Sequence, residues 1–210
     1  GAAIVFPDIS NLKKYNSIVF SIKKDLFRQL YVDVKNLLDA CMASSLKRVY
    51  FFNKSHLPSF IIHINDLVEE KNGNIDDFLE DDILTATFQV KEKDLNVFKR
   101  KILKDEYKSL SFFSWGIYEG IATFEVSLNI ATKGHALKYL AKIFDIPEEN
   151  TIAFGDAEND ISMLNDANEG VFMCNSKDSV IHLGKHFTYK TSDEDGVVDY
   201  LEKMHPELWK

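Results

Sequence analysis

The chain has 210 residues, and its 33 acidic and 25 basic side chains leave a net charge of −8. This balance lacks the surplus of Lys and Arg that neutralises phosphates, so it argues against broad nucleic-acid binding. The 45% share of hydrophobic residues, with 16 Phe and 8 Tyr, can form a core and excludes global disorder. The length fits one large domain or two small ones.

The apolar runs are short. The longest, at residues 17–22 and 60–64, fall far below the ~20 residues that a membrane span needs. No charged and then apolar leader opens the chain, and Cys41 and Cys174 are too few for a disulfide scaffold. We therefore expect a cytoplasmic protein without membrane contact.

The first half of the chain mixes strand and helix patterns. Residues 1–6 indicate a strand, residues 17–22 a second one, and residues 25–41 carry apolar side chains at helical spacing. The β-branched and aromatic residues at 46–52 predict a strand, and residues 58–70 suit a helix. The remaining elements are a strand at 83–90, a helix at 94–103 and a hairpin formed by strands at 111–115 and 121–128.

The second half alternates regularly. Helices are expected at 134–144, over 160–164, at 178–183 and at 194–204. Strands are expected at 151–154, 170–173 and 187–189. Strict alternation is typical of a parallel sheet with helices on its faces. We expect three parts: a core strand and linker at 1–15, an α+β domain at 16–120, and an α/β domain at 121–210.

Two carboxylates follow a predicted buried strand. Asp156 stands where the strand at 151–154 ends, and Asp160 comes one helical turn later. In an open parallel sheet, ligands bind beyond the carboxyl ends of the strands. Two hard oxygen ligands suit Mg²⁺, and Asn159 adds an uncharged donor. The alternative is structural, with Asp156 as a helix cap and Asp160 as first-turn charge.

Lys133 stands just before a predicted helix, where the helix dipole disfavours a cation. A lysine in this position makes sense if it binds a phosphate or offsets a carboxylate cluster. The alternative is a solvated surface lysine.

Together these segments resemble a known family. Lys133-Gly-x-Ala-Leu137, followed by Gly155-Asp-x-x-Asn-Asp-x-x-Met-Leu164, is similar to the third and fourth motifs of the haloacid dehalogenase superfamily, in its Cof-like phosphatase branch. The stretches 170–176 and 191–197 continue the likeness. The resemblance implies a Rossmann-like α/β core with helices on both faces and an inserted α+β cap, for which residues 16–120 have the right size.

The resemblance also implies an activity: Mg²⁺-dependent hydrolysis of a small phosphorylated metabolite, such as a sugar phosphate, through a phosphorylated aspartate. By position, Asp156 would bind the metal, Asn159 would contact the phosphate, and Lys133 would stabilise the transferring phosphoryl group. Asp160 would support the metal or hold Lys133. The alternative is an inactive relative that binds a ligand or a partner.

The chain departs from the family at its first motif, Asp-x-Asp-Gly-Thr after a strand, which is absent, as is the Ser or Thr of the second motif. Asp8 follows an apolar strand, but Ser10 stands where the second Asp belongs. We therefore expect the nucleophile in a segment outside this chain, lost by truncation, proteolysis, disorder or evolution. The 210 residues alone are expected to show little or no turnover.

Overall fold

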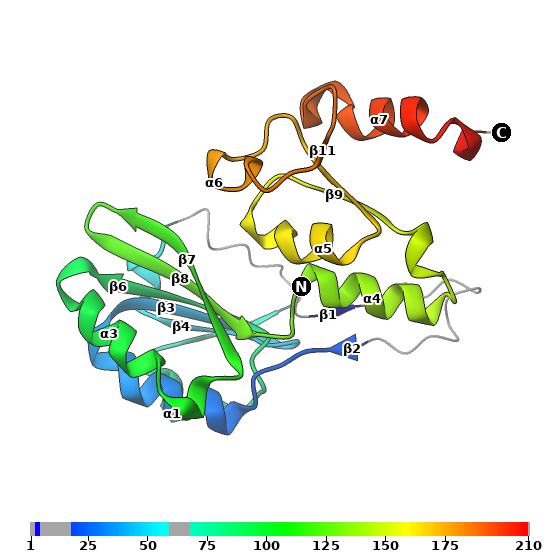
Figure 1. The fold of residues 1–210 in the computed structure, drawn as a ribbon. Coiled ribbons are helices and arrows are strands. Elements are labelled where there is room, and N and C mark those ends of the chain that lie inside the picture. The colour runs from blue at the N-terminus through cyan, green and yellow to red at the C-terminus, as the bar shows by residue number, and fades with distance from the viewer. Residues whose placement is uncertain (1–2, 5–17, 59–67, 210) are drawn as a thin grey trace. The chain divides into compact units, whose positions relative to one another are not determined.

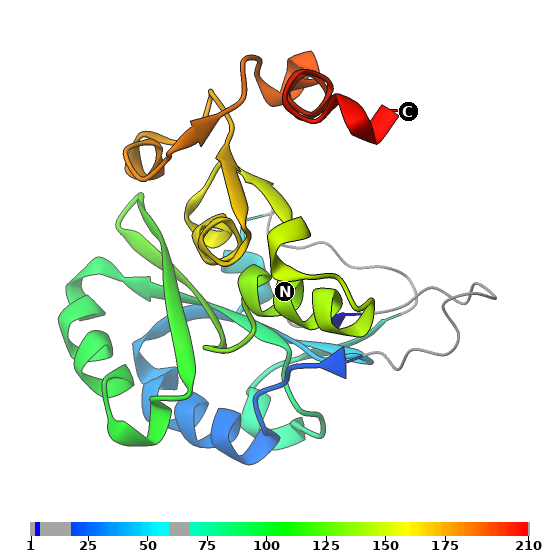
Figure 2. The same ribbon diagram turned by 45° about the vertical axis from the view of Figure 1, so that its right-hand side comes forward.

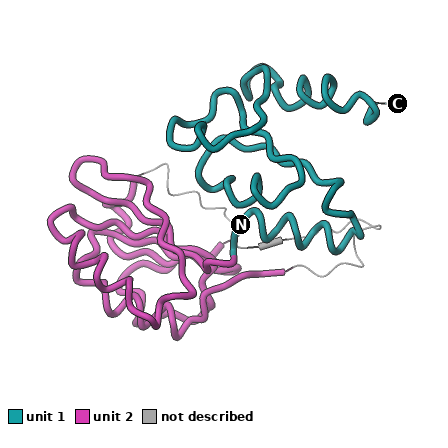
Figure 3. The backbone as a smooth tube through the Cα atoms, viewed as in Figure 1, with its two compact units in different colours: residues 1, 8–15, 131–210 teal, residues 2–7, 16–130 magenta. Residues whose placement is uncertain are grey.

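The structure is a computed structural model, and it describes residues 3–4, 18–58 and 68–209. The chain divides into two compact units (Figure 3). Unit 1 is mainly Ala131–Lys210, and unit 2 is mainly Asn16–Ile130. Most of the expected part at 1–15, including Asp8, lies outside the described residues.

Unit 2 is built on a six-stranded sheet with the order β5-β4-β3-β6-β8-β7. Its strands are β3 (Leu38–Ser44), β4 (Arg48–Phe52), β5 (Glu69–Asn72), β6 (Thr85–Lys91), β7 (Leu110–Tyr118) and β8 (Ile121–Leu128). All neighbours are antiparallel except β4 and β5. The helices α1 (Lys24–Val34) and α3 (Leu95–Ile102) lie on the same side of this sheet (Figures 1 and 2). A short helix, α2 (Ile75–Phe78), and a two-stranded pair, β1 (Ala3–Ile4) with β2 (Ile18–Val19), complete the unit.

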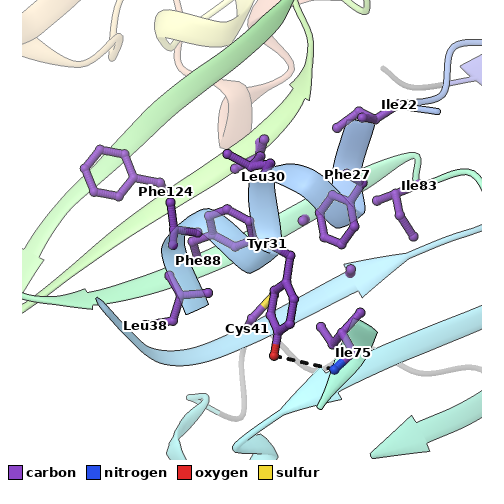
Figure 4. Packing of buried hydrophobic residues seen from close by; sticks show 14 of the residues in the cluster. Ile22, Phe27, Leu30, Tyr31, Leu38, Cys41, Ile75, Ile83, Phe88 and Phe124 are labelled. Atoms are coloured by element: carbon purple, nitrogen blue, oxygen red, sulfur yellow. Dashed lines mark hydrogen bonds between the residues drawn. The ribbon is translucent and has the colours of Figure 1, made fainter. Parts of the chain in front are cut away.

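The core of unit 2 lies between α1, α3 and the sheet. Helix α1 buries residues at helical spacing, which are Phe27, Leu30, Tyr31 and Val34. They pack with side chains of the strands (Figure 4). From α3, Phe98 is fully buried, and its ring centroid lies 5.0 Å from that of Phe124 and 6.3 Å from that of Phe88. Aromatic packing therefore joins α3 to β6 and β8.

Unit 1 contains the parallel strands β9 (Ile152–Gly155), β10 (Glu169–Phe172) and β11 (His186–Phe187). Its helices are α4 (Lys133–Ile143), α5 (Ile161–Asp166), α6 (Asp178–Ile181) and α7 (Gly196–Met204). Leu164 of α5 and Val180 of α6 pack with Ala153 and Phe172 on one face of the sheet. On the other face, the Tyr200 ring of α7 packs edge-on against the Phe154 ring, with 5.7 Å between the ring centroids. The expected α/β arrangement with helices on both faces is confirmed.

Two expectations for the first half are wrong. The helix expected at 25–41 ends at Val34, and residues 38–44 form β3, which pairs with both β4 and β6. Apolar residues at 37, 38 and 41 fit the spacing of a helix as well as that of a strand. The pairing of these residues with β4 and β6 favours the strand. The helix expected at 58–70 is contradicted at its end by β5, while residues 59–67 lie outside the described residues.

The expected boundary between residues 120 and 121 also needs correction. Strand β8 lies between β6 and β7 and pairs with both along its length. The units therefore divide after Ile130, since β8 belongs to the sheet of unit 2.

Among the described residues, none of the helices combines the length and apolar character needed to cross a membrane.

Replacing Phe98 by Ala tests this core. Removing a buried aromatic ring leaves a cavity, so we expect the free energy of unfolding in urea to fall by ~3–5 kcal/mol. Val97→Ala is the matched control because Val97 is the neighbouring helix residue and is 37% exposed. Its effect should be close to ~0.5 kcal/mol. Equal losses for the two variants would contradict the assignment of Phe98 to the core.

Candidate active site

The candidate site lies at the carboxyl ends of the three parallel strands of unit 1. Asp156 follows β9, residues 173–176 follow β10, and Thr188 follows β11. The Met173 amide donates to the Gly155 carbonyl at 2.9 Å, and the Cys174 amide donates to Thr188 Oγ1 at 3.0 Å. These hydrogen bonds hold the three loops together at one edge, where an α/β sheet binds its ligand.

Asp160 is the buried centre of this edge, with 4% of its surface exposed. Lys133 Nζ donates to Asp160 Oδ1 at 2.5 Å. The other oxygen, Oδ2, accepts from the backbone amides of Asp156 at 3.0 Å and Ala157 at 3.2 Å. Both oxygens of the carboxylate are therefore hydrogen-bonded to the protein.

These partners change the acidity of Asp160. Burial by itself raises the pKa of this carboxyl group, because a charged group loses solvation. The Lys133 ammonium and the two backbone amides outweigh that effect and hold the pKa below its usual value. Asp160 is thus an ionised, buried anion that fixes Lys133 and the loop after β9.

Two close approaches of the backbone make this geometry possible. A Cβ atom on Gly155 would lie 2.4 Å from the Asp160 Cβ, so only glycine lets the loop fold back onto that carboxylate. A Cβ on Gly134 would lie 2.6 Å from the Ser162 carbonyl oxygen, at the contact of α4 with α5. The Gly134 amide also donates to Ser162 Oγ at 3.1 Å. Steric contact therefore explains why glycine follows Lys133 and why glycine precedes Asp156.

Lys133 opens α4 after the N-cap Thr132, whose hydroxyl accepts from the His135 amide. The helix dipole disfavours a cation in the first turn, and the Asp160 carboxylate offsets this. The Lys133 side chain keeps 43% of its surface exposed. The ammonium is thus anchored on one side and open to solvent on the other.

Asp156 presents its carboxylate to solvent while its backbone is fixed. Its amide donates to Asp160, and its carbonyl accepts from the Lys177 amide at 3.0 Å. Its side chain is exposed and forms no ion pair with the described part of the chain. Asn159 lies on the same loop and is also exposed. The structure therefore places Lys133, Asp156 and Asp160 together, with Asn159 beside them.

Several supporting residues were not expected from the sequence. Ser162 joins α4 to α5, as described above. The Glu158 carboxylate accepts from Ser179 Oγ and lies 3.6 Å from Lys177 Nζ, which ties the Asp156 loop to the start of α6. No sequence signal marks these contacts, because they join residues that are up to 28 positions apart.

Asp160→Asn removes the charge but keeps the shape of the side chain. The lowered pKa means that ionised Asp160 stabilises the fold above its unfolded pKa, and that this stabilisation is lost as the pH falls through the folded pKa. We expect a loss of ~1–3 kcal/mol in the free energy of unfolding at neutral pH. Urea titrations of both proteins from neutral to acidic pH should show that the difference between their free energies of unfolding becomes smaller once the pH falls below the usual pKa of an aspartate.

Asp156→Asn is the control for this experiment. Its exposed side chain predicts a change of ~0.5 kcal/mol or less at neutral pH. A pH-independent effect of Asp160→Asn would show that the lost stability does not come from the charge.

The chain is similar to known proteins. The family model of haloacid dehalogenase-like hydrolases matches residues 1–201. Phosphatase YwpJ of Bacillus subtilis is 43% identical over 81 residues, which are 39% of this chain and 28% of that protein. The 5-amino-6-(5-phospho-D-ribitylamino)uracil phosphatase YitU of the same organism is 26% identical over 208 residues, covering 97% of this chain and 73% of the relative.

A solved structure agrees in fold. A haloacid dehalogenase-like hydrolase from Bacteroides thetaiotaomicron superposes with a TM-score of 0.69 at 21% identity, over 92% of this chain and 72% of that one. The alignment with YwpJ spans well under two thirds of that relative. Since the family model spans almost the whole sequence, the chain belongs to the family of haloacid dehalogenase-like hydrolases.

Proposed function

We propose that the protein is a Mg²⁺-dependent phosphatase that acts on a small phosphorylated metabolite, for example a sugar phosphate. The observation that carries this proposal is the Lys133–Asp160 ion pair beside the exposed Asp156, at the carboxyl edge of a parallel sheet. Two relatives named as phosphatases, YwpJ and YitU, support the reaction class. The net charge of −8 favours small substrates over polyanionic macromolecules.

Lys133 is proposed to bind the transferring phosphoryl group. Phosphoryl transfer depends mainly on positioning and on neutralising the charge of the phosphoryl oxygens. The Asp160 carboxylate holds the Lys133 ammonium in place before the substrate arrives, so little reorganisation is needed. Asn159 is proposed to donate a hydrogen bond to a phosphate oxygen.

The donor set at this edge fits Mg²⁺, which takes oxygen ligands, keeps several waters and uses only one or two protein carboxylates. The described residues contain no group of three or more His, Cys, Asp or Glu side chains that could hold a metal ion. In our proposal Asp156 would hold the metal, while Asp160, with both oxygens hydrogen-bonded, supports it through Lys133 and the loop amides. When bound, Mg²⁺ supplies positive charge to the phosphate oxygens.

The attacking carboxylate is proposed to come from a segment outside the 210 residues. A phosphoryl group would pass to that carboxylate, while the ester oxygen would leave with a proton from an acid group of the same segment. Water would then cleave the acyl phosphate, which releases phosphate and frees the carboxylate. Unit 2 is proposed to be the cap, since it is an α+β unit beside the α/β unit in sequence.

Lys133→Met tests the charge-neutralising role. In the product of the complete gene, we expect turnover of an aryl phosphate to fall ~10²–10³-fold, because one preorganised charge is lost. Lys138→Met is the matched control, since Lys138 also lies on α4 and forms an ion pair, at 2.6 Å, with Asp166 of α5. Phosphate release should be unchanged in this control.

The inactive-relative alternative predicts no Mg²⁺-dependent release from the complete gene product. The 210-residue chain alone should show no turnover above buffer. Robust turnover by that chain would place the nucleophile inside it, and Asp8→Asn would then be the variant to assay.

Asp156→Asn tests the metal assignment. Removing divalent cations with a chelator should abolish turnover, and added Mg²⁺ should restore it. Because the variant loses a charged oxygen ligand, we expect its half-maximal Mg²⁺ concentration to rise at least ~10-fold. Asp178→Asn, which removes an exposed carboxylate at the start of α6, is the control. An unchanged Mg²⁺ dependence in Asp156→Asn would refute the assignment.

A further inference from the structure

Strand β7 is the last strand of the unit 2 sheet. It pairs with β8 on one side, and no described strand pairs with its other edge (Figure 1). Its nine residues, Leu110–Tyr118, include no charged side chain, although 28% of the whole chain is charged. Proteins usually protect such edges with Lys, Pro, bulges or short strands. Here the one such device is a bulge between Ser114 and Gly116, so most of the edge can pair with another strand.

The same strand carries exposed apolar side chains. Phe113 is 38% exposed, Trp115 47%, Ile117 51% and Tyr118 76%. These four exposed apolar residues lie within six positions, with only the uncharged Ser114 and Gly116 between them. Aromatic residues are enriched at protein interfaces, and contiguous apolar patches mark interaction sites.

The charges at the two ends of β7 are complementary. Lys108 precedes the strand and Glu119 follows it, both are exposed, and neither forms an ion pair within the described residues. In an antiparallel pair of two β7 strands, the Lys108 end of each copy lies beside the Glu119 end of the other. Side chains directly or diagonally opposite across such a pair interact. A second copy of this chain therefore brings opposite charges to both ends of an otherwise uncharged edge.

We propose that β7 is a self-association surface, at which a second copy of the chain pairs edge to edge and antiparallel to form a two-fold symmetric dimer. Two copies with a net charge of −8 each repel over most of their surface, and an uncharged edge avoids that repulsion. One aromatic side chain buries at most about 150–250 Å². Three partly exposed rings and one partly exposed Ile therefore bury less than the ~800 Å² per partner of a standard interface. We therefore expect a weak dimer, with a dissociation constant in the micromolar range.

Sedimentation velocity over a micromolar concentration series tests the proposal. The weight-average mass should rise with concentration toward twice the monomer mass. Trp115→Lys places a charge on the edge and should raise the dissociation constant at least ~10-fold. Leu103→Lys is the matched control, because Leu103 is 80% exposed in the same unit but lies outside β7, and it should dimerise like the unchanged chain. Far-ultraviolet circular dichroism establishes that both variants are folded.

A charge-reversal cycle tests the antiparallel arrangement. Lys108→Glu and Glu119→Lys should each weaken the dimer, and the double variant should recover it. The two positions flank a strand of nine residues that is ~30 Å long, so they are too far apart to interact within a chain, and recovery must come from contacts between copies. A chain that stays monomeric at every concentration would overturn the proposal. So would a dimer that Trp115→Lys leaves unchanged, or single reversals that are not rescued.

Discussion

The candidate site depends on one buried anion. Asp160 connects two segments that are 27 positions apart in the chain, because it accepts from Lys133 with one oxygen and from the loop after β9 with the other. Burial of an unpaired carboxylate would be strongly unfavourable, so the anion requires both sets of donors. The start of α4 and the end of β9 are therefore held in register by a single side chain.

The α/β part of the fold could be predicted because its signals are local. Each strand and helix of unit 1 has its own apolar pattern, and alternation along the chain implies a parallel sheet. Unit 2 was harder. Residues 38–44 form a strand only because β4 and β6 flank them, and β8 was assigned to the wrong unit although its hairpin with β7 was expected. Pairings between strands distant in sequence decided both cases.

For the site, the sequence brought Lys133, Asp156 and Asp160 to one edge, because a motif fixes their spacing around a strand and two helices. The different environments of the two aspartates came only from the structure, where Asp160 is buried and Asp156 is exposed. The contact of Glu158 with Ser179 and Lys177 was not predictable, since it depends on how the loops after β9 and β10 fold against each other.

The two glycine contacts have a consequence for evolution. Helix α5 and the turn before it meet backbone at Gly134 and Gly155, with no room for even a methyl group. The separation of Lys133 and Asp160 is therefore limited by two close contacts of glycine main chain, one with the Ser162 carbonyl and one with the first side-chain atoms of Asp160. Divergence of this lineage should be uneven as a result. Exposed surface positions can change more freely, while these two glycines should be as intolerant of replacement as the charged residues whose spacing they limit.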